Sequence, residues 1–148
     1  MPSSSPSTTY APKTTDFYQV ADAAGVPVVH IPLPEVHSVA LAVGGSGVVG
    51  LDSTRPMTRA EEQTHIGHEL GHCLYGGFYS RSSPYDMIER HELRADRWYI
   101  RHAIPRQTLF RLLHDGRDVW EIAEILDTTE EYVIQAYYYY KENPQNET

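Results

Sequence analysis

The sequence predicts an α+β fold with a short N-terminal β-sheet or hairpin followed by helices. Three observations support this prediction. Residues 26–51 hold runs rich in Val, Ile and Leu that are broken by Pro and Gly, as is typical of strands. From residue 58 onward, helix caps and helically spaced apolar residues replace this pattern. The chain has 148 residues, which is enough for one domain with its own hydrophobic core.

The two ends of the chain differ in composition from its middle. Residues 1–13 are rich in Pro, Ser and Thr and lack the basic and apolar regions of a signal peptide, so we expect a disordered tail there. Residues 142–148 are expected to form a second disordered tail. A single domain is therefore predicted over residues 14–141.

Composition and charge exclude several classes of protein. No stretch approaches the roughly 18 apolar residues of a membrane span. The formal net charge of -8 argues against direct nucleic-acid binding, which relies on Lys and Arg to neutralise phosphates. The one cysteine rules out an intramolecular disulfide and fits a reducing compartment. We therefore expect a cytoplasmic protein with no membrane partner.

The N-terminal elements are short. Thr14 or Thr15 is the predicted cap of a helix that runs to about residue 24. Residues 26–31 follow as a strand that its prolines confine to a sheet edge. Residues 36–43 and 47–51 are two further strands, and the glycines between them predict a hairpin. A free edge of such a hairpin can pair with an extended peptide, although a purely structural hairpin fits the sequence equally well.

The next helix is predicted to begin at Thr58, which forms a capping box with Glu61, and to stop at Gly76-Gly77. Gly67 and Gly71 lie on one flank, and each costs about 1 kcal/mol relative to Ala within a helix. We expect the close approach of a neighbouring backbone to compensate for this cost. A helical wheel also predicts an apolar side that packs into the core, formed by Ile66, Leu70, Cys73 and Leu74.

This helix contains the sequence His68-Glu69-Leu70-Gly71-His72, an H-E-x-x-H motif. Positions i and i+4 share a helix face, so both histidines can bind one small cation. Glu69 lies beside them, in position to act as a general base towards water. The pattern is typical of zinc hydrolases. Taken alone, the motif is also compatible with an amphipathic helix that exposes two histidines to solvent.

A second stretch, Glu92-Leu93-Arg94-Ala95-Asp96, supports the metal interpretation. Its two carboxylates share a helix face at i, i+4. Catalytic zinc takes three protein ligands, of which His₂Glu is a standard set, and ligating histidines usually donate their other ring nitrogen to a carboxylate. Glu92 is therefore the predicted third ligand and Asp96 the partner of one histidine. For this stretch alone, a solvated charged face is the alternative.

Two alternatives to Glu92 as the third ligand have to be considered: the histidine position of the metzincin class and His91. Metzincins continue the motif with Gly and His, where this chain has Tyr75 and Phe78, so that class is excluded. His91 adjoins Glu92 and offers another imidazole, but its choice would leave Asp96 without a role.

The second metal-binding helix is predicted to run from Ser83-Pro84, as N-cap and first residue, to about residue 103, and a further helix spans residues 106–114. Residues 117–141 resemble a helix-turn-helix pair. However, residues 117–148 carry two basic side chains and eight acidic ones, whereas phosphate contacts come from Lys and Arg. We therefore expect a structural pair or a docking surface for a partner protein.

The run H-E-L-G-H, then E-x-x-A-D-R-W at residues 92–98 and Pro105 beyond it, resembles the ImmA/IrrE family of metallopeptidases. The resemblance covers roughly residues 14–140, and the two metal motifs are its specific part. Arg94 stands where the family often has Glu, and Tyr99 where it often has Ala. These departures do not touch the predicted ligands.

The resemblance implies a small zincin-like domain in which two helices bind one Zn²⁺ through His68, His72 and Glu92, with Glu69 as the catalytic residue. Characterised members cleave a helix-turn-helix repressor encoded by a phage or mobile element, so the resemblance implies a zinc-dependent endopeptidase with such a repressor as its protein substrate. For the stabilisation of an oxyanion, Tyr75, Tyr79 and His91 are the candidates.

Two other functions stay open at the level of sequence. One is a non-proteolytic regulatory or binding module with a structural or vestigial metal site. Glu69 argues against it, because a purely structural site needs no general base. The other is a peptidase whose target is an antitoxin or another regulator.

Overall fold

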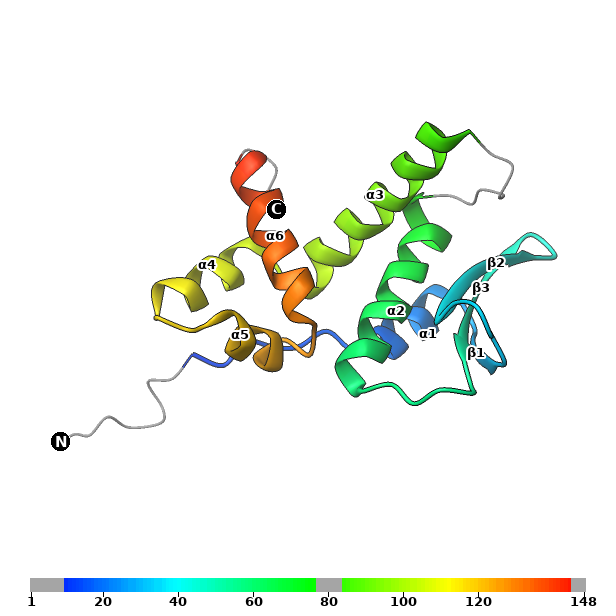
Figure 1. The fold of residues 1–148 in the computed structure, drawn as a ribbon, viewed down its shortest axis with the longest axis horizontal. Coiled ribbons are helices and arrows are strands. Elements are labelled where there is room, and N and C mark those ends of the chain that lie inside the picture. Colours follow the sequence, from blue (N-terminus) through cyan, green and yellow to red (C-terminus); the bar gives the residue numbers. More distant parts are fainter. Residues whose placement is uncertain (1–9, 77–83, 145–148) are drawn as a thin grey trace.

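The structure, a computed structural model, describes residues 10–76 and 84–144 (Figure 1). It has an α+β architecture, as predicted, with a small sheet at one end and the C-terminal helices at the other. In chain order the elements are α1 (Phe17–Ala24), β1 (Val28–Ile31), β2 (Ser38–Val43), β3 (Ser46–Asp52), α2 (Arg59–Gly71), the π-helical turn η2 (His72–Gly76), α3 (Tyr85–Ala103), α4 (Arg106–His114), α5 (Val119–Ile125) and α6 (Glu130–Glu142).

The sheet is mixed, with strand order β1-β3-β2. β3 pairs antiparallel with β2 and parallel with β1, so the predicted hairpin is confirmed and β1 is an edge strand. Gly44 and Gly45 form the hairpin turn with φ of 57° and 84°, a left-handed conformation that favours glycine. β2 is the other edge, and it contacts α2 on the side that bears the metal motif.

The first helix begins later than the sequence predicts. Asp16 is its N-cap and accepts a hydrogen bond from the Tyr18 backbone N–H at 3.0 Å. The prediction of Thr14 or Thr15 as the cap is therefore wrong. The Thr14 hydroxyl donates instead to the carbonyl of Ile125 in α5, and the Thr15 hydroxyl donates to the carbonyl of His102 near the end of α3. Of the predicted N-terminal tail, residues 1–9 lie outside the described ranges, while Tyr10 packs against the core.

α2 begins at the predicted capping box, in which the Glu61 N–H donates to Thr58 Oγ1 at 3.1 Å and the Thr58 N–H donates to Glu61 Oε1 at 2.9 Å. Its core side holds Ile66 and Leu70, both fully buried. The prediction that Leu74 shares this side is wrong, since Leu74 is 43% exposed. The chain changes to π-helical geometry at residue 72, and this rotates the following side chains away from the α-helical wheel.

The remaining helices follow the predicted order. The N-cap of α3 is Pro84, with no side-chain cap bond, so the assignment of Pro84 as the first helical residue is wrong; Ser83 lies outside the described residues. The sheet and the helices share one cluster of buried side chains, which extends from Phe17 in α1 to Tyr140 in α6. The division into one domain and two tails stays a prediction. No helix in residues 10–76 and 84–144 is long and apolar enough to cross a bilayer.

Candidate metal centre

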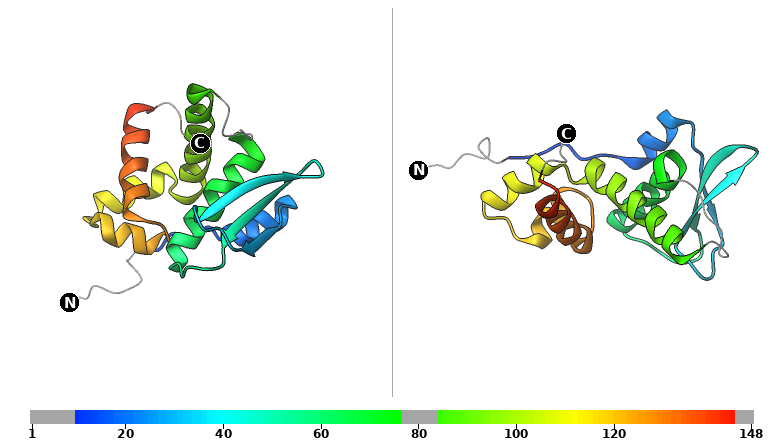
Figure 2. Two further views of the ribbon diagram at one scale, coloured as in Figure 1. Left: turned by 45° about the vertical axis from the view of Figure 1, so that its right-hand side comes forward. Right: turned by 90° about the horizontal axis from the view of Figure 1, so that it is seen from above.

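The site is formed where α2 crosses α3 at close range. A Cβ added to Gly71 would lie 2.9 Å from both the Cα and the carbonyl oxygen of Ala95, so only a glycine allows this approach. The expectation of a neighbouring backbone is thus confirmed at Gly71. At Gly67 the neighbour is the ring of Tyr99 rather than a backbone. Figure 2 shows the two helices side by side, with the sheet beyond α2.

The crossing brings the three predicted ligands together. Glu92 Oε1 lies 3.0 Å from His68 Nε2, and Glu92 Oε2 lies 2.9 Å from His72 Nε2. One ligand atom from each residue lies within 4.8 Å of the other two, and the group is partly buried. Among the described residues, the groups that can hold a metal ion in this way do not include His91, the alternative third ligand.

Asp96 lies on the outer side of His68. The distance from Asp96 Oδ1 to His68 Nδ1 is 2.9 Å, which orients the ring with Nε2 towards Glu92. Burial lowers the pKa of His68, but the hydrogen bonds to Asp96 and Glu92 raise it to about 10. Two carboxylates on one imidazole thus create a strong local preference for positive charge, from a proton or a metal ion.

The residues fit a metal ion of the zinc type. Two imidazoles and one carboxylate form a donor set that Zn²⁺ prefers, and the Asp96 carboxylate supplies the partner that a ligating histidine requires. The separations of 2.9 and 3.0 Å between ligand atoms are slightly below the spacing of about 3.3 Å expected for tetrahedral ligands around zinc. The group can therefore hold a metal ion after small side-chain adjustments.

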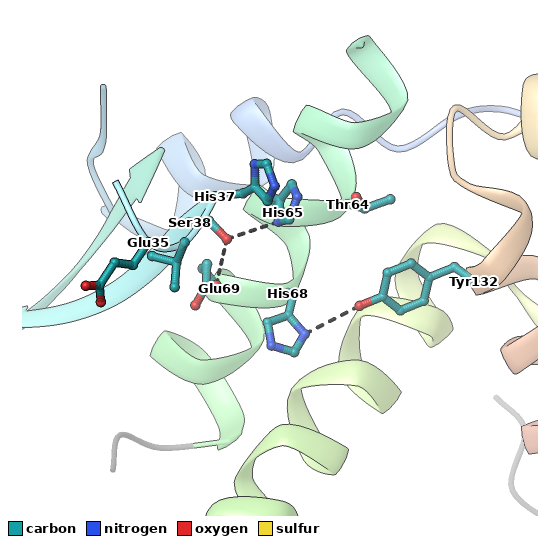
Figure 3. Close-up of a pocket in the computed structure, with 9 residues that line it drawn as sticks. Glu35, His37, Ser38, Thr64, His65, His68, Glu69 and Tyr132 are labelled. Carbon is teal, nitrogen blue, oxygen red and sulfur yellow. Dashed lines mark hydrogen bonds between the residues drawn. The ribbon is translucent and has the colours of Figure 1, made fainter. Parts of the chain in front are cut away.

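Glu69 lies in the wall of the adjacent pocket and is only 8% exposed. The hydroxyl of Ser38, at the start of β2, donates to Glu69 Oε2 at 2.8 Å (Figure 3). Burial raises the pKa of Glu69, while the neighbouring histidine charges and the Ser38 hydrogen bond oppose this rise. His65 Nδ1 lies 3.1 Å from Ser38 Oγ, and since the hydroxyl proton is directed to Glu69, the imidazole is the donor in this pair.

The pocket has a volume of about 440 Å³ and lies between the start of β2, the exposed side of α2 and the N-terminal end of α6. Its wall includes Ser38, His65 and Tyr132 beside the predicted His68 and Glu69. Sequence reasoning missed these three residues because none is in a motif. Ser38 and Tyr132 reach the site only through the packing of β2 and α6. His65 is on α2 itself, three residues before His68, and this position in the helix is a signal that could have marked it as a candidate.

Two of the predicted oxyanion donors, Tyr75 and His91, are not among the described residues that line the pocket. Tyr75 is 60% exposed at the end of η2, and Tyr79 lies outside the described residues. Tyr132, which lines the pocket, is a further hydroxyl near the metal group: its oxygen lies 3.5 Å from His68 Nδ1 (Figure 3).

No known protein family, curated protein or solved structure matches this chain. The resemblance to the ImmA/IrrE family therefore rests on the sequence pattern, with the two metal motifs as its specific part, and stays a prediction.

Proposed function

We propose that this chain is a zinc-dependent endopeptidase with a zincin-like domain of the ImmA/IrrE type. The observation that supports the proposal is the convergence of His68, His72 and Glu92 next to a pocket that Glu69 lines. A structural metal site would have no use for a buried carboxylate in the wall of an adjoining pocket. The zinc would be bound by the two Nε2 atoms and the Glu92 carboxylate, one ion per chain.

The chemistry requires a base beside the metal. Zinc, when bound, supplies a Lewis acid that makes water more acidic and polarises a peptide carbonyl. Glu69 is the base in this proposal, and its raised pKa keeps it closer to the pH at which proton transfer is efficient. Ser38 holds Glu69 Oε2. In this proposal Oε1 would take the proton from water and pass it to the leaving amine. Asp96 fixes His68 so that its Nε2 faces the ligand group.

The substrate in this proposal is a helix-turn-helix transcriptional repressor, whose cleavage releases genes of a phage or mobile element. This part rests on the family resemblance. The acidic chain, with net charge -8, is electrostatically compatible with a basic DNA-binding protein.

Co-expression with helix-turn-helix repressors encoded near the gene tests the proposal, with new N-termini identified by terminal labelling. We expect cleavage by the wild type and none by Glu69→Gln, which keeps the shape of the side chain and all three ligands. Zinc content of both proteins is measured in the same preparations. Glu89→Gln, at an exposed position on α3, is the matched control and is expected to cleave normally.

Retained cleavage by Glu69→Gln would contradict the assignment of the base. A wild type that binds zinc but cleaves none of the repressors would favour the regulatory module instead. A wild type that binds no zinc after reconstitution would exclude the metal centre itself.

A further inference from the structure

The C-terminal helical pair reaches the metal centre, although its sequence suggests a separate role. Tyr132 and Gln135 lie on α6, the second helix of this pair. In DNA-binding proteins with two such helices, the second one reads the bases in the major groove. Here two residues in the N-terminal half of α6, Tyr132 and Gln135, contact Asp96 on α3 instead.

Three hydrogen-bond donors converge on the Asp96 carboxylate. Oδ1 lies 2.9 Å from His68 Nδ1 and accepts the Tyr132 hydroxyl at 2.7 Å, and Oδ2 accepts Gln135 Nε2 at 3.2 Å. A carboxylate bound from both sides is held in one orientation. Without the two donors from α6, Asp96 would be free to turn towards solvent, since its side chain is 24% exposed.

Tyr132 itself is held firmly in place by the core. Its ring packs against the ring of Tyr99 with a centroid distance of 4.6 Å. The Tyr99 hydroxyl in turn bonds to Thr128 Oγ1 at 2.6 Å, and both residues are buried. The Tyr132 backbone N–H donates to the Thr129 side chain at the N-cap of α6. The hydroxyl of Tyr132 is therefore presented to Asp96 by a rigid framework.

We infer that Tyr132, assisted by Gln135, is a positioning residue of the metal centre, which acts on His68 through Asp96. The inference rests on the metal centre of the proposed function but not on proteolysis. It assigns to α6 the task of holding the carboxylate that orients His68.

Zinc affinity, measured by competition with a chromophoric chelator, tests the inference without any substrate. Loss of a direct carboxylate partner of a ligating histidine typically weakens binding by roughly 10- to 100-fold. We expect this range for Asp96→Ala. Tyr132→Phe keeps the ring against Tyr99 and removes only the hydrogen bond to Asp96, which itself contacts the histidine. We therefore expect a smaller loss of zinc affinity, about threefold to tenfold. Gln135→Leu, on the exposed side, is expected to lose less than Tyr132→Phe.

A double-mutant cycle separates positioning from general damage to the fold. If Tyr132 acts through Asp96, Tyr132→Phe should cause no further loss of zinc affinity in the Asp96→Ala background. Tyr137→Phe is the matched control, because this tyrosine is on the same helix and its hydroxyl accepts a bond from Lys141 at the surface. It should bind zinc like the wild type.

The imidazole NMR signal of His68 in zinc-loaded protein provides a second measurement, which does not need Asp96→Ala to fold. We expect the Nδ1–H resonance to shift in Tyr132→Phe and to stay in place in Tyr137→Phe. An unchanged resonance, an unchanged zinc affinity in Tyr132→Phe, or an equal loss in both backgrounds would overturn the inference while leaving the metal centre intact. A wild type that binds no zinc would overturn both.

Discussion

Gly71 on α2 lies directly against Ala95 on α3, with space for no side-chain atom between the two backbones. The two histidines of the motif, His68 and His72, lie three residues before and one residue after Gly71. Glu92 and Asp96 lie at the same offsets from Ala95. The site is thus arranged around this contact, and the distance between the helices here sets the distance from the two histidines to Glu92 and Asp96.

Gly71→Ala is expected to damage both stability and metal binding. The new Cβ would meet backbone atoms, which cannot rotate away, so the helices must separate. Overpacking of this kind costs about 1–3 kcal/mol, and the better helix propensity of Ala offsets up to about 1 kcal/mol. We expect a net loss of about 1–2 kcal/mol in urea unfolding of the metal-free protein. Zinc affinity should fall by about tenfold, because ligands must keep their geometry within about 0.5 Å.

Ala23→Gly is the matched control for this variant. Residue 23 is exposed on α1, away from the site, and the substitution costs about 1 kcal/mol through helix propensity alone. It should therefore lower stability without a change in zinc affinity. Equal zinc affinities for Gly71→Ala and the wild type would show that the helix crossing does not set the geometry of the site.

Removal of Glu92 should abolish zinc binding at ordinary concentrations. Glu92→Ala deletes the residue that faces both histidines, and we expect affinity to fall by more than about 100-fold. Elemental mass spectrometry should find about one zinc per wild-type chain and little in the variant. His91→Ala and Glu89→Ala, on the same helix, should retain the metal. Loss of zinc in His91→Ala but not in Glu92→Ala would reverse the assignment of the third ligand.

The sequence predicted the site more completely than the fold around it, and the reason is physical. Residues at i and i+4 of a helix share a face whatever the helix packs against, so the two motifs predicted the three residues that the structure brings together, and Asp96 beside them. The order of helices and the hairpin also followed from local signals such as the Thr58 cap and the glycines at residues 44–45. These features depend on neighbours in the sequence alone.

The features that the sequence did not predict depend on contacts between distant segments. Ser38 reaches Glu69 only because β2 lies beside α2, and Tyr132 reaches Asp96 only because α6 folds back on α3. The π-helical turn at residue 72 has no simple local signal, so an α-helical wheel places Leu74 on the wrong side. At the start of α1, Thr14, Thr15 and Asp16 are all good caps, and tertiary hydrogen bonds of the threonines decide among them.

Ser38→Ala should slow cleavage while leaving zinc binding unchanged. The variant removes the hydrogen bond from Ser38 to Glu69 Oε2, so the carboxylate is less well oriented towards water. We expect kcat to fall by about tenfold, a fraction of the total contribution of a general base, with KM little changed. Ser38→Thr keeps a hydroxyl and should restore most of the rate.

Ser46→Ala is the control for this variant. Ser46 is an exposed serine at the start of β3, and its variant should cleave like the wild type. If Ser38→Ala lost zinc as well as activity, the serine would act on the fold of the site rather than on the base.

Asp52 should make folding stability depend on pH, independently of the metal. Its buried carboxylate accepts hydrogen bonds from the backbone N–H groups of Leu33 at 2.9 Å and Thr54 at 3.1 Å, and from Arg55 Nε at 2.6 Å. The Leu33 bond and those from Arg55 and Thr54 outweigh burial and hold the pKa of Asp52 far below its usual range. Arg55 also donates to the carbonyls of Leu33 and Val36, so this cluster fixes the segment that leads to Ser38 and the pocket.

The sign of the effect follows from the lowered pKa. In the unfolded chain Asp52 takes up a proton near pH 4, whereas in the folded protein it stays ionised, so acid favours the unfolded state. The stabilisation is therefore complete above about pH 5 and is lost as the pH falls below about 4 towards the folded pKa. Urea unfolding with EDTA present should show Asp52→Asn well below the wild type at pH 7, with the difference shrinking by about pH 3. Asp22→Asn, at an exposed position on α1, is the control and should show no such convergence. A difference in stability between Asp52→Asn and the wild type that stays constant with pH would refute the role of the Asp52 carboxylate.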